Sequence, residues 1–133
     1  MNKIEHIGIA VKNLETSNEL FAKILGKKHY KVEQVQSEGV STSFFLAGDS
    51  KIELLEATNP DSAIAKFIEK RGEGLHHVAF QVEDIHSEIK RLKSEGFVFT
   101  RDEPFLGADN KLVCFLHPKS TNGVLIELCQ ERA

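Results

Sequence analysis

The sequence predicts a fold of the α+β class in which two βαβββ modules, related by a pseudo-twofold axis, form one curved sheet around a central site. Three observations support this prediction. A segment that begins at His6 is repeated from His77, each copy is followed by a helical pattern that ends at a glycine, and three short strand patterns follow each helix. We expect module 1 at about 1–58 and module 2 at about 74–133, in a single domain that spans residues 1–133.

The repeated segment has the order His, apolar, small, apolar, any residue, Val, any residue, Asn or Asp, and Leu or Ile. Its two copies occupy 6–14 and 77–85. Apolar residues alternate along each copy, which is typical of a strand with one buried face. Asn13 and Asp84 end the strands and are residue types that cap helix N-termini. Each module therefore begins with a strand that leads directly into a helix.

The helical pattern after each copy places its apolar residues on one face and ends at a glycine. In module 1 the apolar face consists of Leu14, Phe21, Ile24 and Leu25, and the helix ends at Gly26. In module 2 the apolar face consists of Ile85, Ile89 and Leu92, and the helix ends at Gly96. Three strands are predicted beyond each helix, at about 29–36, 41–47 and 51–56 in module 1 and at about 97–101, 111–116 and 123–129 in module 2.

A short helix is predicted in the linker of about 59–72 that joins the modules. Asn59-Pro60-Asp61-Ser62 has the composition of a helix start, and Gly72 supplies a stop. The apolar face between them consists of Ile64, Phe67 and Ile68.

The composition argues against several classes of function. With 17 basic and 20 acidic residues, a net charge of −3 disfavours a nucleic-acid-binding protein. No apolar run approaches the roughly 20 residues that a transmembrane helix needs, and residues 1–6 carry acid and imidazole where a signal peptide would be apolar. Cys114 and Cys129 form neither a metal-binding pair nor a disulfide framework. We expect a cytoplasmic protein with no nucleic-acid or membrane partner.

The repeat places four metal-ligating residue types at equivalent positions: His6 and His77 on the first strands, and Glu53 and Glu127 on the last strands. Each Glu lies within an apolar strand. Strand side chains alternate between faces, so both carboxylates should point away from the helix-covered face. The pseudo-twofold would then bring all four residues together. Two imidazoles and two carboxylates suit a divalent ion such as Zn, Co, Ni, Mn or Fe(II).

Each of these residues has a simpler explanation when taken alone. A Glu in a half-buried strand usually faces solvent, a single strand His is more often structural than a ligand, and a repeat can retain residues for packing symmetry. The presence of all four at equivalent positions favours the metal site. His76 is an adjacent rival to His77, but strand alternation turns it to the opposite face.

The segments 6–11, 74–80 and 123–128 resemble the vicinal oxygen chelate superfamily, which contains glyoxalases, bleomycin resistance proteins and dioxygenases. The resemblance covers essentially the whole chain and is strongest to the methylmalonyl-CoA epimerase family. The motifs that carry this narrower resemblance are 51–56, 61–68 and 115–120. Lactoylglutathione lyase (glyoxalase I) is the close relative that these motifs leave as an alternative.

The resemblance implies a glyoxalase-like curved sheet around a site where His6, Glu53, His77 and Glu127 ligate one divalent ion, which would be Co, Zn, Ni or Mn. It also implies a homodimer and an acyl-CoA substrate. The implied reaction interconverts (R)- and (S)-methylmalonyl-CoA by proton abstraction through a metal-stabilised enolate. Glu127 would be one base and Glu53 the other. The same metal and bases would serve glyoxalase I, which isomerises a glutathione hemithioacetal.

Two positions bear on the choice between these families. Some epimerases have Gln where this chain has Glu53, whereas glyoxalases of bacterial type have Glu, so this position leaves both families open. One proposal for the epimerases places an acidic residue on the strand after Gly39. Here that run is Val40-Ser41-Thr42-Ser43, without a carboxylate, so the second base must come from elsewhere.

The loop at 117–122 is longer than its counterpart in module 1. Lys119 and Ser120 in this loop are candidates for contacts with the phosphates or the pantetheine arm of coenzyme A. An ordinary solvated turn explains the loop equally well.

Two further functions occur on the same fold, namely metal-free drug binding and Fe(II) dioxygenase chemistry. A drug-binding protein has no reason to retain the four polar residues, and a chain with one Tyr and no Trp is a poor source of an aromatic cleft. A dioxygenase needs two His, one carboxylate and open positions for oxygen, so the fourth ligand disfavours it.

Overall fold

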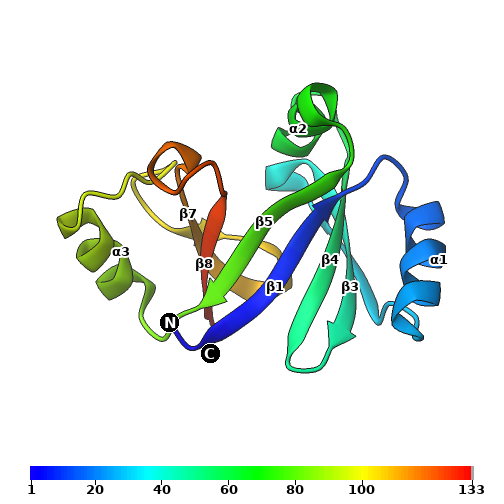
Figure 1. Cartoon of the computed structure of the whole chain (residues 1–133), viewed down its shortest axis with the longest axis horizontal. Coiled ribbons are helices and arrows are strands. Elements are labelled where there is room, and N and C mark those ends of the chain that lie inside the picture. The colour runs from blue at the N-terminus through cyan, green and yellow to red at the C-terminus, as the bar shows by residue number, and fades with distance from the viewer. Residues whose placement is uncertain (133) are drawn as a thin grey trace. The chain divides into compact units, whose positions relative to one another are not determined.

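The computed structural model describes residues 1–132. Its elements are, in chain order, β1 (Lys3–Ala10), α1 (Leu14–Leu25), β2 (Lys31–Val35), β3 (Val40–Ala47), β4 (Ser50–Ala57), α2 (Ala63–Arg71), β5 (Gly74–Gln81), α3 (Ile85–Ser94), β6 (Phe105–Leu106), β7 (Lys111–Leu116) and β8 (Ile126–Glu131) (Figure 1). Short 3-10 helices lie at Gln36–Glu38, Ala108–Asn110 and Pro118–Ser120. The order βαβββ occurs on each side of α2, as the sequence repeat predicts.

The chain divides into two compact units. Unit 1 contains residues 1–5 and the chain from His77 onward, and unit 2 contains His6–His76. The first residues of β1 therefore pack with the second half of the chain. Within unit 1, the N–H of Asn2 donates to the carbonyl oxygen of Gln81 at 2.8 Å. The division of one domain into module, linker and module stays a prediction of the sequence.

In unit 2 the strands follow the order β2-β3-β4-β1. The strands β1 and β4 run parallel, and the other neighbours are antiparallel. Helix α1 covers one face of this sheet (Figure 1). The core beneath it consists of Val11, Leu14, Phe45 and Leu54, packed with Ile9, Phe21, Ala22, Leu25 and Ile52. Because strand side chains alternate, Glu53 points to the other face, as expected from the sequence.

Helix α2 packs against part of that other face. The cluster beneath it consists of Ala10, Val40, Leu55 and Ile64, packed with Val35, Ala57, Phe67 and Ile68. Leu55 lies two residues beyond Glu53 and so shares its face. The linker helix therefore covers one end of the face that carries Glu53.

In unit 1 the strands follow the order β5-β8-β7-β6, with β5 and β8 parallel. Helix α3 covers one face (Figure 1). The core on that side consists of Val82, Ile85, Ile89, Leu92, Cys114, Leu116 and Leu128. On the opposite face Phe105 packs against Ala79, Val113 and Cys129. Glu127 precedes Leu128 and points to this second face, so its orientation matches that of Glu53 in unit 2.

The helices begin at the predicted capping residues. Asn13 Oδ1 accepts the N–H of Thr16 at 2.9 Å, and Asp84 Oδ1 accepts the N–H of Ser87 at 3.1 Å. Ser62 caps α2 in the same way. These bonds satisfy N–H groups that have no partner within the first turn of a helix. Among the helices of the described chain, none is both long and apolar enough to cross a membrane.

The strand predicted at 97–101 is wrong. Phe99 forms only an isolated bridge with Leu116, and the strand of this region is β6, which pairs with β7 through Phe105 and Val113. The loop between Phe99 and β6 ends at Pro104, which has no N–H to donate to a sheet. Phe99 and β6 both pair with β7. The edge strand is therefore interrupted by the loop between them.

Both cysteines are buried and free. Cys114 lies opposite Leu128 in the sheet, and Cys129 lies opposite Val113. Neighbouring positions on a strand face opposite sides, so the two thiols point to different faces and cannot form a disulfide.

Candidate functional site

Unit 2 holds a buried pair of His6 and Glu53. In the parallel pairing of β1 with β4, Glu53 stands opposite Gly8, two residues beyond His6. Both side chains therefore occupy the same face of the sheet. The Nδ1 atom of His6 lies 3.1 Å from Oε2 of Glu53, and each side chain is 5% exposed.

Unit 1 holds the equivalent pair of His77 and Glu127. In the parallel pairing of β5 with β8, Glu127 stands opposite Ala79, two residues beyond His77. The Nε2 atom of His77 lies 3.2 Å from Oε1 of Glu127, and the side chains are 5% and 7% exposed. The register is the same as in unit 2. The sequence repeat therefore brings each predicted His together with the predicted Glu of its own module.

A phenylalanine lies beside each glutamate on the neighbouring antiparallel strand. Phe44 stands opposite Glu53, and Phe115 stands opposite Glu127. The ring of Phe115 also meets the imidazole of His77 edge-on, with centroids 5.7 Å apart and planes at 88°. These rings exclude water from one side of each carboxylate. A buried carboxylate without a partner is costly, so the adjacent imidazole or a cation is required there.

The donor atoms of each pair fit a divalent metal ion. Two ligands that bind an ion at about 2.1 Å and at right angles lie about 3 Å apart. The nitrogen–oxygen separations of 3.1 and 3.2 Å in the two pairs match this spacing. Imidazole nitrogen and carboxylate oxygen are also ligands that Zn, Co, Ni and Mn accept. The same separations suit a direct ion pair between imidazolium and carboxylate, so each pair is compatible with the metal-free protein too.

His76 faces away from this chemistry, as strand alternation predicts. Its ring meets that of Phe67 on α2 edge-on, with centroids 4.8 Å apart. His77, its neighbour in sequence, is turned toward Glu127 instead. The two adjacent histidines are therefore distinguished by what they contact.

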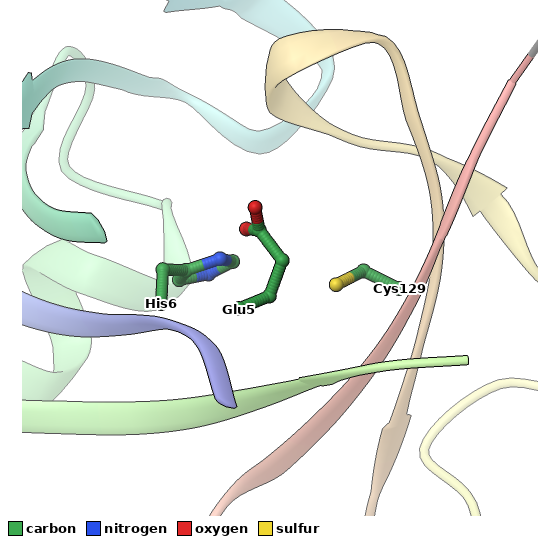
Figure 2. Close-up of side chains that lie close together, drawn as sticks. All are labelled: Glu5, His6 and Cys129. Carbon is green, nitrogen blue, oxygen red and sulfur yellow. The ribbon is translucent and has the colours of Figure 1, made fainter. Parts of the chain in front are cut away.

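Buried charges that the sequence analysis missed lie in unit 1. Glu5 is 2% exposed and Lys111 is 5% exposed. The Nζ atom of Lys111 lies 3.9 Å from Glu5 Oε2 and 3.1 Å from Glu131 Oε1. The side chains of Glu5 and Cys129 lie close together (Figure 2), and a carboxylate oxygen of Glu5 is within 4.8 Å of the Cys129 sulfur. No sequence pattern marks Glu5 as buried, because its charged partner Lys111 lies far along the chain.

Lys119 and Ser120, the predicted coenzyme contacts, lie in the 3-10 helix Pro118–Ser120. The N–H of Lys119 donates to Nδ1 of His117 at 3.1 Å. The hydroxyl of Ser120 donates to the carbonyl oxygen of His117 at 3.0 Å and accepts from the N–H of Val98 at 3.4 Å. Ser120 therefore fastens the loop to its surroundings, and contact with a coenzyme stays a prediction for both residues.

The glyoxalase/bleomycin resistance protein/dioxygenase superfamily is the class that this fold and these paired His and Glu residues define. Residues 5–115 match the model of that superfamily, and the chain belongs to it. The resemblance found in the sequence motifs is thus confirmed at the level of the superfamily.

Within the superfamily, the chain is similar to methylmalonyl-CoA epimerases. It is 39% identical over 132 residues to the ethylmalonyl-CoA/methylmalonyl-CoA epimerase of Cereibacter sphaeroides, covering 98% of each chain. A variant of the Streptomyces coelicolor methylmalonyl-CoA epimerase, solved with 2-nitronate-propionyl-CoA, superposes with a TM-score of 0.94 at 33% identity, covering 100% of this chain and 99% of the other. A methylmalonyl-CoA epimerase solved with methylmalonyl-CoA and an ammonium ion gives the same score and identity, covering 100% and 96%.

Proposed function

We propose that this protein is a methylmalonyl-CoA epimerase that interconverts the (2R) and (2S) epimers of its substrate. The observation that carries the proposal is the pair of buried His–Glu contacts at the same register in both modules, His6 with Glu53 and His77 with Glu127. The similarity to named epimerases supports the substrate, because one of those structures holds methylmalonyl-CoA.

The reaction needs a base and an acid but no oxidant or reductant. The C2 atom of the substrate lies between a thioester carbonyl and a carboxylate. A base removes the C2 proton, and the electron pair of the C–H bond delocalises onto the thioester oxygen to give an enolate. Delivery of a proton to the opposite face of C2 then gives the other epimer. The protein must therefore place acid–base groups on both faces of C2 and stabilise the negative oxygen.

Glu127 is proposed as one acid–base group and Glu53 as the other. Each is a buried carboxylate paired with an imidazole. A carboxylate has two oxygens, so one oxygen can stay with its partner while the other exchanges a proton. Low exposure favours such exchange with a bound substrate over exchange with bulk water.

His6, Glu53, His77 and Glu127 are also the residues that we propose hold one divalent metal ion, on the chemistry of their donor atoms and on the repeat that selects them. When bound, the ion would supply positive charge that stabilises the developing enolate oxygen and orients the substrate.

The test follows the C2 proton of (2R)-methylmalonyl-CoA by NMR in D₂O, with metal-reconstituted protein at catalytic concentration. We expect loss of the C2 proton signal and formation of the (2S) epimer well above the protein-free rate. The Glu127→Gln variant should lose turnover and keep the fold. Glu131→Gln is the matched control, because Glu131 lies on the same strand but is 71% exposed.

Absence of exchange in the metal-loaded wild-type protein would remove the epimerase assignment. The same preparation is then assayed with the glutathione hemithioacetal of methylglyoxal, which is the substrate of the glyoxalase I reaction. Full activity of Glu127→Gln would remove the role assigned to Glu127.

A further inference from the structure

A row of stacked side chains leads away from His77 in unit 1. The ring of Phe115 contacts His77 edge-on, with centroids 5.7 Å apart. The ring of Phe105 stacks on Phe115, with centroids 6.2 Å apart and planes at 29°. The guanidinium carbon of Arg101 lies 3.7 Å from the centroid of Phe105. The row therefore connects a proposed catalytic pair to an exposed cation.

The three rings of the row lie on the sheet face that α3 leaves uncovered. Phe115 stands opposite Glu127, and Phe105 packs with Val113 and Cys129 on that face. Both rings are only partly buried. Partly exposed aromatic rings beside a proposed catalytic site are surfaces that a bound molecule can cover.

Arg101 lies in the loop that interrupts the edge strand, and the sheet holds this loop at both ends. On one side the N–H of Thr100 donates to the carbonyl oxygen of Phe115 at 2.9 Å. On the other side Phe105 pairs with Val113. The loop therefore presents Arg101 from a fixed base, which is how functional loops are commonly positioned.

The chemistry of the guanidinium group indicates the class of ligand. The guanidinium carbon lies over the Phe105 ring, and the N–H donors of the group lie in its plane and match the oxygens of a phosphate. Asp102 and Glu103 follow Arg101 and are exposed, so they weaken the positive potential around it. These two carboxylates should therefore partly offset the attraction of Arg101 for a phosphate.

We propose that Arg101 binds a phosphate group of the coenzyme A carrier, and that Phe105 and Phe115 form the wall along which the pantetheine arm runs to the proposed catalytic site. This inference rests on the proposed function, because the acyl-CoA substrate comes from it. It assigns a coenzyme contact to a loop different from that of Lys119 and Ser120.

The test compares two thioesters that differ in their phosphates. For methylmalonyl-CoA, Arg101→Ala should raise KM about five- to tenfold with little change in kcat, since one charge-assisted phosphate contact is lost. For methylmalonyl-pantetheine, which has no phosphate, KM should not change. Arg101→Lys should recover part of the loss. The double variant Asp102→Asn/Glu103→Gln should lower KM for the CoA thioester only.

Lys93→Ala is the matched control. The Nζ atom of Lys93 lies 6.0 Å from the centroid of Phe99, so it is also a cation beside a ring, but Phe99 packs with the core under α3. This variant should leave both KM values unchanged. An equal change for both thioesters in Arg101→Ala, no change for either, or the same change in Lys93→Ala would overturn the proposal.

A calorimetric titration with free coenzyme A separates this inference from the proposed function. If the wild-type protein binds coenzyme A but does not exchange the C2 proton, the proposed epimerase function is wrong. The Arg101 proposal is then still tested by the change in the Kd for coenzyme A in Arg101→Ala. Wild-type protein that epimerises its substrate, with an unchanged Kd for coenzyme A in Arg101→Ala, would remove the phosphate contact alone.

Discussion

The side-chain oxygen of Gln130 accepts the backbone N–H of Ile85 at 2.7 Å, which ties the last strand of unit 1 to the first residue of α3. Unit 2 contains the same link, because Oε1 of Glu56 accepts the N–H of Leu14 at 2.7 Å. Each acceptor lies three residues beyond the proposed catalytic glutamate of its module. The repeat thus preserves the anchoring of the helix together with the His–Glu pair.

Because one acceptor is an amide and the other a carboxylate, exchanging Gln130 for Glu and Glu56 for Gln should change the free energy of unfolding in opposite directions. A carboxylate at a helix N-terminus interacts favourably with the helix dipole, so Gln130→Glu should raise the free energy of unfolding by about 0.3–1 kcal/mol, and Glu56→Gln should lower it by a similar amount. Truncation of either residue to Ala should cost about 1–2 kcal/mol, because the hydrogen bond itself is lost. Urea unfolding near neutral pH measures all four variants. Identical stabilities for Glu56→Gln and Glu56→Ala would contradict the role of the hydrogen bond.

Metal binding should distinguish the two adjacent histidines. Titration calorimetry with Co²⁺ should show a loss of affinity on the order of tenfold or more for His77→Gln, since a proposed ligand is removed. His76→Gln should keep the affinity of the wild-type protein and lose the edge contact with Phe67, worth about 0.5–1.5 kcal/mol of stability. Equal losses of affinity in both variants, or no binding to the wild type, would reject the ligand assignment.

The cap of α3 should make stability depend on pH. The hydrogen bond from the backbone N–H of Ser87 holds the pKa of Asp84 below its usual value of 3.8. The folded state therefore favours the carboxylate form, and the resulting stability is present above the unfolded-state pKa and is lost as the pH falls through the lower folded-state pKa. Asp84→Asn keeps a capping side chain without this titration.

The measurement compares urea midpoints of wild type and Asp84→Asn at about pH 6 and about pH 3. Wild type should lose more stability than the variant over this interval. Parallel losses in wild type and variant would show that Asp84 has no part in the acid sensitivity.

Two glycines with similar backbone angles should respond differently to Ala. Gly26 has φ 74° and open space where the methyl group of an alanine would lie, whereas a Cβ at Gly39, with φ 66°, would lie 2.6 Å from Asn59 Nδ2 and 2.9 Å from Ser62 Cβ. Gly26→Ala should cost about 1–2 kcal/mol for the left-handed conformation alone. Gly39→Ala should cost about 1–3 kcal/mol more, because the neighbours must move. Equal unfolding free energies for the two variants would show that the neighbours yield without strain.

Much of the fold follows from patterns that act locally. The alternation around His6 and His77, the capping residues and the glycine stops predict strands and helices in the order that the structure shows. The faces of Glu53 and Glu127 follow as well, since alternation leaves a strand residue only two directions. The His–Glu contact within each module needed the repeat in addition, because the residues that form it are far apart in sequence.

The parts that the sequence could not predict depend on tertiary context. The run 97–101 has the apolar content of a strand, but pairing stops because the loop that ends at Pro104 separates Phe99 from β6. Glu5 is a charged residue that is buried, and its partner Lys111 lies far along the chain. Long-range partners of this kind leave no periodic signal.

The placement of residues 1–5 in the unit formed by the second half of the chain affects how the chain can fold during its synthesis. These residues are synthesised long before their partners, because Gln81, which pairs with Asn2, and Lys111, which pairs with Glu5, lie much further along the chain. Residues 1–5 therefore cannot form these native contacts while the rest of the first half folds. Unit 1 can therefore be completed only after β7 and β8 have been synthesised, whereas all residues of unit 2 are made before those strands.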